Sequence, residues 1–563
     1  MATYQLLMER ILGNACFSEI GKPSGIYWSA DKSLLAIASS FDWLQWSGRE
    51  IDTKSKSKLK FKNRLCVYHA DTLKLVGVVD GIEFPINSVS FHPNNHILAI
   101  GTGSYDGGYF FKGKLLIWDI QTDEVHSHFN ESREVTQCKF SEDGETLYIV
   151  IRPEYDGVVD GLDLQYDYYT YGTANYFEKV SVDTLSILDM ETTGIHQPYD
   201  KQELKDVYKE LTSLASPLFP MYENRGYIWD VLINDREIVS VCDNRLIEKW
   251  TTEGNRIRKV EGINEGRAVE IAGDLHGNSF WINVEVKKRK VGGYSWHSVL
   301  FHWDGMSDTL QKAVEREFTF SITHTNTGQL FARDVGYYRG KGPSRDFIVD
   351  KTFETSDALD LGYYSLFNTY LNIKGADDYY FVQGTPKSSH EDKWLCRLNP
   401  LTKEYSRLFP LEWDITRNAH LFSDGGCYCR DSQGEALILA ARIYHSHTKE
   451  EDSFIMRRDL QNGDLLWEQT FKSQVTAMTW IQKYNLVIFA LADGKIGVLS
   501  ALNGQMMSLT DCIINGVNSM VISLDSKDDK IVGGTIDGRI LLFTIQASYE
   551  KFFGFHNRNE TTV

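Results

Sequence analysis

A short unit recurs along this chain: the end of an apolar strand, a polar turn and the start of a second strand. The six clearest copies begin at Val67, Ile117, Ile187, Arg397, Arg457 and Val498. They read VYHADTLKLV, IWDIQTDEVH, ILDMETTGIH, RLNPLTKEYS, RRDLQNGDLL and VLSALNGQMM. Recurrence of one unit at intervals of tens of residues is typical of repeat architectures. We therefore predict a succession of small, similar structural units.

The clearest copy predicts that each unit contains four antiparallel strands. Its expected strands run from Ile86 to Phe91, Ile97 to Gly101, Lys114 to Asp119 and Glu124 to Phe129, with turn-forming residues between them. The opening strand recurs at Val135, Val475 and Val517. Asp-Gly dipeptides at Asp493-Gly494 and Asp537-Gly538 tolerate the positive φ that tight hairpins need.

These units resemble the repeats of WD40 β-propeller proteins. Trp118-Asp119 and Trp303-Asp304 stand near the end of an expected third strand, where that family carries its Trp-Asp dipeptide. Other copies have Tyr68-His69, Leu188-Asp189, Lys249-Trp250 or Leu499-Ser500 at this place. The resemblance implies an all-β propeller of four-stranded antiparallel blades and an interaction role, without implying any chemistry.

About ten third strands are expected. They lie near Val67, Ile117, Ile187, Lys249, Phe301, Phe347, Leu395, Ile455, Val498 and Leu542. We prefer one wide, continuous ring; two rings, or insertions within 318–420, are the alternatives. Residues 1–23 are an N-terminal segment, 24–548 the propeller with insertions at 42–63, 152–179 and 197–222, and 549–563 a C-terminal tail. The strand near Ile26-Tyr27-Trp28 is expected to close the ring against the run from Ile540 to Ile545.

The insertion at 197–222 contains a predicted amphipathic helix between two blades. Leu204, Val207, Tyr208, Leu211 and Leu214 have helical spacing, and they follow Asp200 as a capping residue. Most such apolar stripes pack on their own domain, and docking of a partner is the alternative.

The insertion at 152–179 mixes tyrosines with carboxylates. Its candidate partner-binding residues are Tyr155, Asp156, Asp160, Asp163, Tyr166, Asp167, Tyr168, Tyr169 and Tyr171. Tyrosine offers contact area at little entropic cost, so these residues suit recognition of a protein. A loop held over the propeller rim by its own tyrosines is the alternative.

The insertion at 42–63 carries lysines at every second position. If the segment is extended, Lys54, Lys56, Lys58, Lys60 and Lys62 share one face. Such a face suits an acidic partner or a phosphate backbone, although a solvated edge strand is the more ordinary explanation. We include Lys54, Lys56 and Lys58 among the candidate partner-binding residues. A second basic run, Lys287 to Lys290, is expected to be a hairpin tip.

Composition and motifs argue against several classes of function. A formal net charge of −18 makes general nucleic-acid binding unlikely, and the eight dispersed cysteines fit buried, reduced thiols. The sequence has no apolar run long enough for a membrane span and no secretory pattern at its start, so we expect a cytoplasmic protein without membrane contact. Phosphate-loop, zinc-protease and nucleophile-elbow motifs are absent from the sequence. We expect no catalytic residue, no cofactor and no metal.

Two functions remain from these observations. The preferred one is a non-catalytic platform that holds one or more proteins through its loops and the Tyr/Asp insertion. The alternative is a propeller enzyme or small-ligand sensor with its site at the mouth of the central channel. Converging charged groups in the channel would favour the alternative, and an apolar plug would favour the platform.

Overall fold

The structure is a computed structural model. It describes residues 2–41, 44–46, 49–51, 61–105, 111–128, 134–151, 158–159, 162–163, 175–181, 187–195, 202–216, 223–243, 246–261, 266–274, 278–290, 293–324, 329–335, 345–350, 352–356, 358–362, 373–384, 393–411, 419–445 and 450–549. Within these residues the fold is all-β, as predicted, with the single α-helix α1 (Leu204–Ala215). The described sheets of three or more strands comprise seven with four strands, one with five and two with three.

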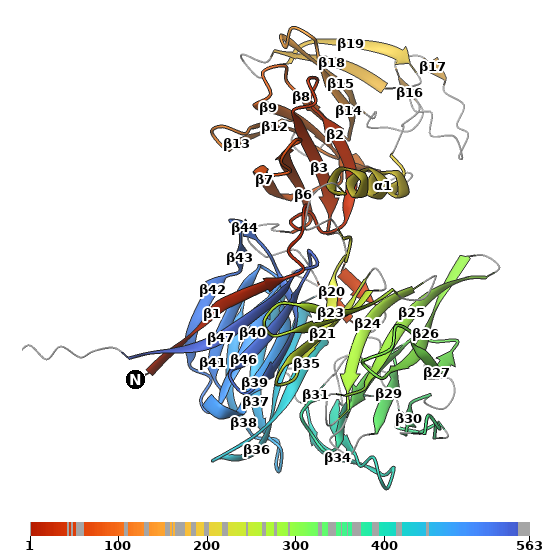
Figure 1. Cartoon of the computed structure of the whole chain (residues 1–563), viewed down its shortest axis with the longest axis vertical. Helices are drawn as coiled ribbons and strands as arrows, with labels where there is room; N and C mark the ends of the chain where they lie inside the picture. Colours follow the sequence, from red (N-terminus) through yellow and green to blue (C-terminus); the bar gives the residue numbers. More distant parts are fainter. Residues whose placement is uncertain are drawn as a thin grey trace, which may run out of the picture.

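Three four-stranded sheets and α1 form a first group, drawn at the top of Figure 1. Their strands, in spatial order, are β2 (Pro23–Trp28), β3 (Leu34–Ser40), β6 (Asn63–His69) and β7 (Leu75–Ile82); β8 (Ile86–Phe91), β9 (Ile97–Thr102), β12 (Leu115–Asp119) and β13 (Glu124–His128); β14 (Val135–Phe140), β15 (Thr146–Ile151), β18 (Asn175–Ser181) and β19 (Ile187–Ile195). Three short hairpins interrupt them: β4 (Leu44–Trp46) with β5 (Arg49–Ile51), β10 (Ser104–Tyr105) with β11 (Phe111–Lys112), and β16 (Val158–Val159) with β17 (Leu162–Asp163).

The other sheets form a second group, drawn in the lower part of Figure 1. Four of them contain β20 (Ile228–Ile233), β21 (Glu237–Cys242), β22 (Leu246–Thr251) and β23 (Arg256–Glu261); β24 (Gly266–Gly273), β25 (Phe280–Lys290), β26 (Gly293–Trp303) and β27 (Gln311–Arg316); β28 (Phe320–His324), β29 (Leu330–Asp334) and β30 (Phe347–Val349); β32 (Tyr379–Gln383), β33 (Trp394–Leu398) and β34 (Tyr405–Pro410).

Three more sheets complete the second group. They contain β31 (Ile373–Lys374), β35 (Ala419–Asp431), β36 (Gly434–His445), β37 (Glu450–Asp459) and β38 (Leu465–Phe471); β39 (Val475–Ile481), β40 (Leu486–Leu491), β41 (Lys495–Ser500) and β42 (Met506–Asp511); β45 (Val521–Lys527), β46 (Lys530–Thr535), β47 (Ile540–Tyr549) and β1 (Ala2–Leu12). A short hairpin joins β43 (Ile513–Ile514) to β44 (Val517–Asn518).

The chain ends meet in one sheet of the second group. β1 pairs antiparallel with β47, from Ala2 opposite Tyr549 to Leu12 opposite Ile540. The prediction that the strand near Ile26 would close against Ile540–Ile545 is therefore wrong, because residues that we had set aside as an N-terminal segment occupy that edge. The strand near Ile26 is β2 of the first group, where it pairs with β3.

Several sheets that follow one another in the chain contact each other through one strand of each sheet, which we call the inner strand. In the second group β20 contacts β24, β24 contacts β28, β35 contacts β39 and β39 contacts β45. β20 also contacts β45 and β46. This packing differs from the preferred single ring of all ten units, because the sheet with both chain ends packs against β20 and the first group branches off between β1 and β20.

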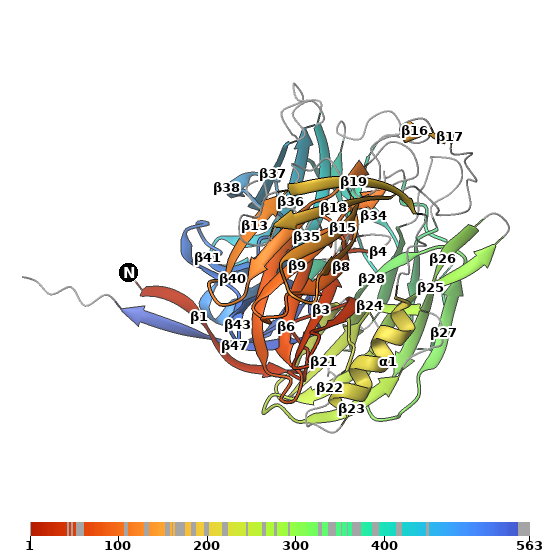
Figure 2. The same ribbon diagram turned by 90° about the horizontal axis from the view of Figure 1, so that it is seen from above.

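The predicted helix is confirmed and belongs to the first group, but its N-cap is Glu203 and the prediction of Asp200 as the capping residue is wrong. α1 begins after Glu203 and buries Val207, Leu211 and Ala215, which cluster with apolar residues of β2 and β3. The indole N–H of Trp28 donates to Glu210 at 2.8 Å. The apolar stripe of α1 therefore covers its own group of sheets, as the usual explanation of such a stripe expects. Figure 2 shows α1 beside the sheets of the first group when the molecule is seen from above.

The recurring sequence unit corresponds to one hairpin geometry. In five sheets the residue four positions after the start of the turn has positive φ, at Leu73, Asp123, Lys403, Gly463 and Gly504. In four of these turns its N–H donates back across the turn, as from Lys403 to the carbonyl oxygen of Asn399 at 2.9 Å. The sixth copy was misread: Ile187 begins the fourth strand of its sheet, and β18 is the third.

Introducing a glycine at this turn position in one sheet and removing a glycine there in another should change the free energy of unfolding in opposite directions. Lys403 has a φ of 61°, and because the left-handed region costs a side-chain-bearing residue about 1 kcal/mol, Lys403→Gly should raise the free energy of unfolding by up to about 1 kcal/mol. A Cβ at Gly504 would lie 2.7 Å from the Trp467 ring, so Gly504→Ala should lower the free energy of unfolding. Urea unfolding at equal protein concentration measures both, and a shift in the same direction for the two variants would contradict the shared turn geometry.

Candidate functional site

Eight of the ten described sheets of three or more strands share one irregularity. In β2, β8, β14, β20, β24, β35, β39 and β45 the pairing register shifts by one residue. Such a bulge leaves one residue unpaired and re-aims its side chain. In the second group the residues at the shifts are Trp229, Val269, Asp424, Thr476 and Ile522.

These bulges surround a small cavity between the inner strands of the second group. Trp229, Val269, Asp424 and Thr476 line it, and its volume is about 40 Å³. Its charged lining residues are Arg49, Asp230, Glu270, Lys374 and Asp424. A water needs roughly 10 to 15 Å³ of such space, so the cavity has room for a few waters.

The acidic groups of the cavity have partners within the chain. Lys374 Nζ lies 3.3 Å from Asp230 Oδ1, and Arg442 Nε lies 3.1 Å from Asp424 Oδ2. The amide of Gln474 also donates to Asp424, at 2.9 Å. Burial of a carboxylate is costly unless it is paired and hydrogen-bonded, and these contacts satisfy that need.

Among the acidic residues that line the cavity, Glu270 has a strongly raised pKa. Its carboxylate accepts hydrogen bonds from Ser321 Oγ at 2.6 Å, the Ile322 N–H at 2.8 Å and Asn283 Nδ2 at 3.0 Å. Burial raises its pKa to about 8, although these three donors act in the opposite direction. Glu270 therefore carries a proton in part of the molecules near neutral pH.

A segment of the first group reaches into this centre. We call its described residues within 41–61, namely Phe41, Leu44–Trp46, Arg49–Ile51 and Phe61, the arm, which lies between β3 and β6. Arg49 of the arm donates from its guanidinium to the carbonyl oxygens of Thr476 and Ile522, at two of the bulges. Phe41, Ile51 and Phe61 form one buried cluster with residues of the second group, namely Tyr227, Trp229, Val269, Val335, Ala492, Met520, Ile522 and Ile536. The arm thus occupies the centre of the second group with apolar side chains and one arginine.

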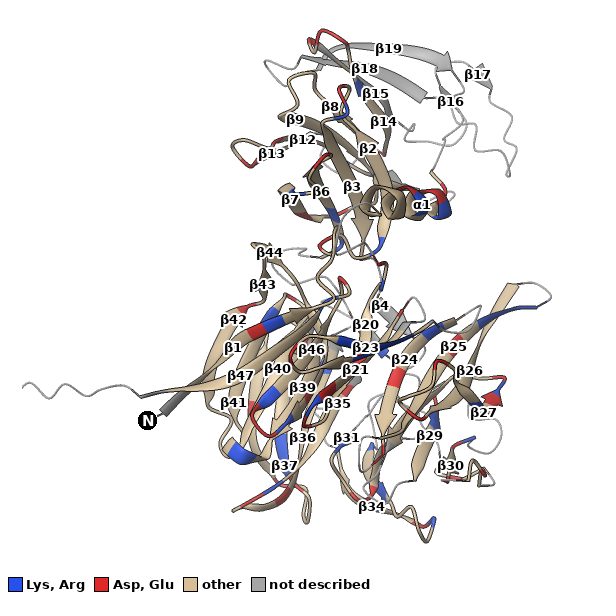
Figure 3. Ribbon diagram, in the orientation of Figure 1, with Lys and Arg blue, Asp and Glu red and all other residues tan. Residues whose placement is uncertain are grey.

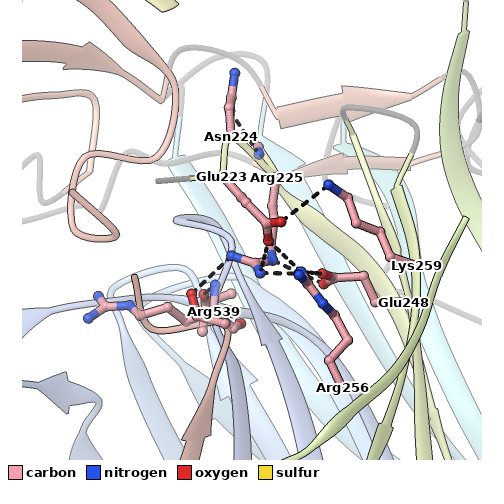
Figure 4. Close-up of polar contacts among 10 residues, drawn as sticks. Glu223, Asn224, Arg225, Glu248, Arg256, Lys259 and Arg539 are labelled. Atoms are coloured by element: carbon pink, nitrogen blue, oxygen red, sulfur yellow. Dashed lines mark hydrogen bonds and ion pairs between the residues drawn. The ribbon is translucent and has the colours of Figure 1, made fainter. Parts of the chain in front are cut away.

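A charged network holds the chain where it passes between the groups (Figure 4). Arg225, which returns from the first group, donates to the carbonyl oxygen of Gly13 at 3.0 Å and pairs with the buried Glu248 of β22 at 3.0 Å. Gly13 directly follows β1 on the way out. Arg225 of the returning connection therefore binds both the outgoing connection and a strand of the second group.

Glu223 completes the network from the other side. Its carboxylate contacts Arg225 at 2.7 Å, Lys259 at 3.2 Å and Arg256. Burial alone would raise the pKa of Glu223, but the hydrogen bond from Arg256 and the charges of Arg225, Arg256 and Lys259 lower it to about 2. Glu223 is therefore ionised at all physiological pH values, and its charge offsets part of the positive charge of Arg225, Arg256 and Lys259.

The residues predicted to bind a partner lie almost entirely outside the described residues. This holds for Tyr155, Asp156, Asp160, Tyr166, Asp167, Tyr168, Tyr169, Tyr171, Lys54, Lys56 and Lys58, while Asp163 has only its backbone described, in β17. The structure describes the flanks of the lysine stripe, where Phe61 is buried in the central cluster.

The cavity residues were missed by the sequence analysis. Arg49 lies inside the insertion at 42–63, where the alternating lysines form a visible pattern and a single arginine does not. Asp230, Glu270 and Asp424 come from three sheets, so their meeting depends on the packing of distant strands. The bulges that aim them have no sequence motif comparable to the Asp-Gly turns.

The cysteines, all within the described part of the chain, are unbonded. Seven are buried and Cys16 is partly exposed. The described residues contain no group of three or more His, Cys, Asp or Glu that is placed to hold a metal ion. Among the described helices, none has the length and apolarity that a membrane span requires.

Comparisons with known proteins give no family. No protein-family model and no curated protein matches the chain. Among solved structures the chain is similar to the crystal structure of the computationally designed Ika8 protein, with 14% sequence identity and a TM-score of 0.23, over 82% of this chain and 96% of that chain. A TM-score this low carries no argument about fold or function.

The pKa of Glu270 predicts a pH-dependent stability. The folded value of about 8 exceeds the ordinary value of 4.5, so between these pH values the folded chain holds a proton that the unfolded chain has released. The free energy of unfolding should therefore fall as the pH rises through this window. Glu270→Gln cannot titrate, so its profile should be flatter, as measured by urea unfolding at a series of pH values.

An exposed carboxyl provides the control. Glu317→Gln should keep the profile of the unmodified protein, because Glu317 is solvent-exposed and its charge stays in water. Identical pH profiles for Glu270→Gln and the unmodified protein would contradict the assignment.

Proposed function

We propose that this protein is a non-catalytic platform that binds one or more proteins. The single observation that carries this proposal is the occupancy of the second group's centre by the chain's own arm. In propeller enzymes and sensors a ligand needs that place, whereas here Phe41, Ile51, Phe61 and Arg49 take it. The working surfaces then lie on the outside, on loops and hairpin tips.

We propose further that the seven sheets of the second group form a β-propeller related to the WD40 family. In this proposal the sheet of β1, β45, β46 and β47 closes the ring by packing against β20. The contacts of β20 with β45 and β46, together with those of consecutive inner strands, support it. Propellers commonly have four to eight blades, a range that includes seven. The first group is then a three-sheet appendage inserted between β1 and β20.

The size of the central cavity and the pairing of its charges argue against a substrate or small-ligand site at the centre of the second group. Small-molecule sites commonly enclose about 300 to 1,000 Å³, and the cavity here has about 40 Å³. Its carboxylates are paired with Lys374 and Arg442 or accept several hydrogen bonds. Carboxylates with such partners stabilise the contact between sheets and have little remaining capacity to bind a substrate.

The Tyr/Asp insertion remains the proposed contact for a partner, and the test uses it directly. The chain is purified from its native cells after in-cell cross-linking, beside a variant in which residues 155–171 are replaced by a Gly-Ser segment of equal length. We expect a stoichiometric partner with the unmodified chain and about a tenfold smaller yield of partner with the variant, because hot-spot aromatic residues dominate such interfaces.

A chain without residues 550–563 is the matched control and should retain the partner. Recovery of the unmodified chain as a lone monomer would contradict the platform. Undiminished partner binding by the replaced chain would contradict the role of the insertion.

A further inference from the structure

The hairpin formed by β25 and β26 extends beyond the strands on either side of it (Figure 1). Pairing with β24 ends at Val286, and pairing with β27 ends at Ser298. Lys287–Lys290 and Gly293–His297 therefore continue as a two-stranded ribbon, held by pairs from Lys287 opposite Trp296 to Lys290 opposite Gly293. A two-stranded ribbon is only marginally stable by itself in water, so we expect this extension to have a function.

One face of this ribbon alternates cations with aromatic rings. Lys287 lies opposite Trp296 and Arg289 opposite Tyr294, and because side chains alternate along a strand, these four share a face. Figure 3 shows the basic run as a continuous stretch at the end of β25. We call this surface, made of Arg267, Lys287, Arg289, Tyr294 and Trp296, the basic aromatic face.

The side chains of this face are ordered against one another. Lys287 Nζ lies 4.4 Å from the Tyr294 ring centroid, and the Arg267 guanidinium lies 4.7 Å from the Trp296 ring. Arg267 is itself fixed by Glu285 at 2.7 Å. Tyr294 is nevertheless 60% exposed and Trp296 38% exposed. Large aromatic residues held in place and left exposed are typical of binding surfaces.

The ribbon carries a surplus of positive charge. Lys288, on the opposite face, pairs with Glu315, which also contacts Lys312. Within the described residues, Lys287, Arg289 and Lys290 have no acidic partner. The chain as a whole is acidic, with a net charge of −18, so a concentrated basic surface is an exception on this molecule.

The outer edge of the ribbon is also open. The N–H of Ser298 donates to the carbonyl oxygen of Phe318 at 3.0 Å, and the chain then turns into β28. No described residue pairs with the outer edge of β26 from Gly293 to His297. An extended peptide can add to such an edge through its backbone.

We propose that the basic aromatic face binds an extended acidic segment of a partner protein. Its carboxylates would meet Lys287 and Arg289, and its backbone would pair with the open edge of β26. The inference rests on the proposed function, for which it names a surface and the chemistry of the partner. Single-stranded nucleic acid fits less well, because it has no peptide backbone with which to pair along the open strand edge.

The test measures binding of a fluorescent oligoglutamate of about twelve residues to the full chain by fluorescence anisotropy. We expect saturable binding that weakens about tenfold in Lys287→Glu/Arg289→Glu and falls as salt rises from about 50 to about 500 mM. Lys205→Glu/Lys209→Glu changes the charge equally on the exposed face of α1 and should leave the affinity unchanged. Tyr294→Ser/Trp296→Ser should weaken binding without a charge change.

Several outcomes would overturn the inference: no saturable binding, equal binding by Lys287→Glu/Arg289→Glu, or tighter binding of an oligothymidylate of the same length. The same double variant separates this inference from the proposed function. Weaker peptide binding by the double variant, with undiminished recovery of the native partner, would support the face and leave the platform standing on the Tyr/Asp insertion. Clear peptide binding by a chain that recovers no native partner would support the face and refute the platform.

Discussion

The pairing of the first strand with the last is the constraint on which the rest of the structure depends. β1 pairs with β47 in the second group and β20 of the same group begins at Ile228, so the chain leaves this group after Leu12 and returns before Ile228. Everything between these positions, including three sheets and α1, is an excursion with two connections that meet. Arg225 of the returning connection binds the outgoing connection at the carbonyl oxygen of Gly13 and the second group at the carboxylate of Glu248.

The arm gives the first group a contact with the second group in addition to the two connections. Arg49 donates to carbonyl groups at two bulges, and three apolar side chains of the arm are buried in the same place. Truncation of one partner of a buried charged pair commonly costs about 3 to 5 kcal/mol, because the other charge is left uncompensated. The paired contacts of Asp230 and Asp424 therefore stabilise the packing of the sheets around the cavity.

Local features of this fold could be predicted from the sequence, and long-range ones could not. The hairpin turns are visible because Lys403, Gly463 and Gly504 lie at one position of a repeated unit whose chemistry is local. The closure by β1 was missed because residues such as Gln5 and Gln546 are 541 positions apart, and β1 carries no turn or repeat of its own. The copy at Ile187 was misread because β18 lies in a segment whose composition resembles an insertion. The cavity escaped prediction for a related reason: Glu270 and Asp230 come together only through the packing of separate sheets.

A disulfide engineered between the terminal strands tests the closure most directly. Leu7 and Thr544 are direct partners across β1 and β47, and the Cα separation of about 4.5 to 5.5 Å for such pairs lies within the range of disulfides. Mild oxidation of Leu7→Cys/Thr544→Cys should give a cross-link that mass spectrometry assigns to these two positions, with a raised melting temperature. Failure of this bond, together with an efficient bond in Tyr27→Cys/Thr544→Cys, would place β2 at that edge and contradict the account.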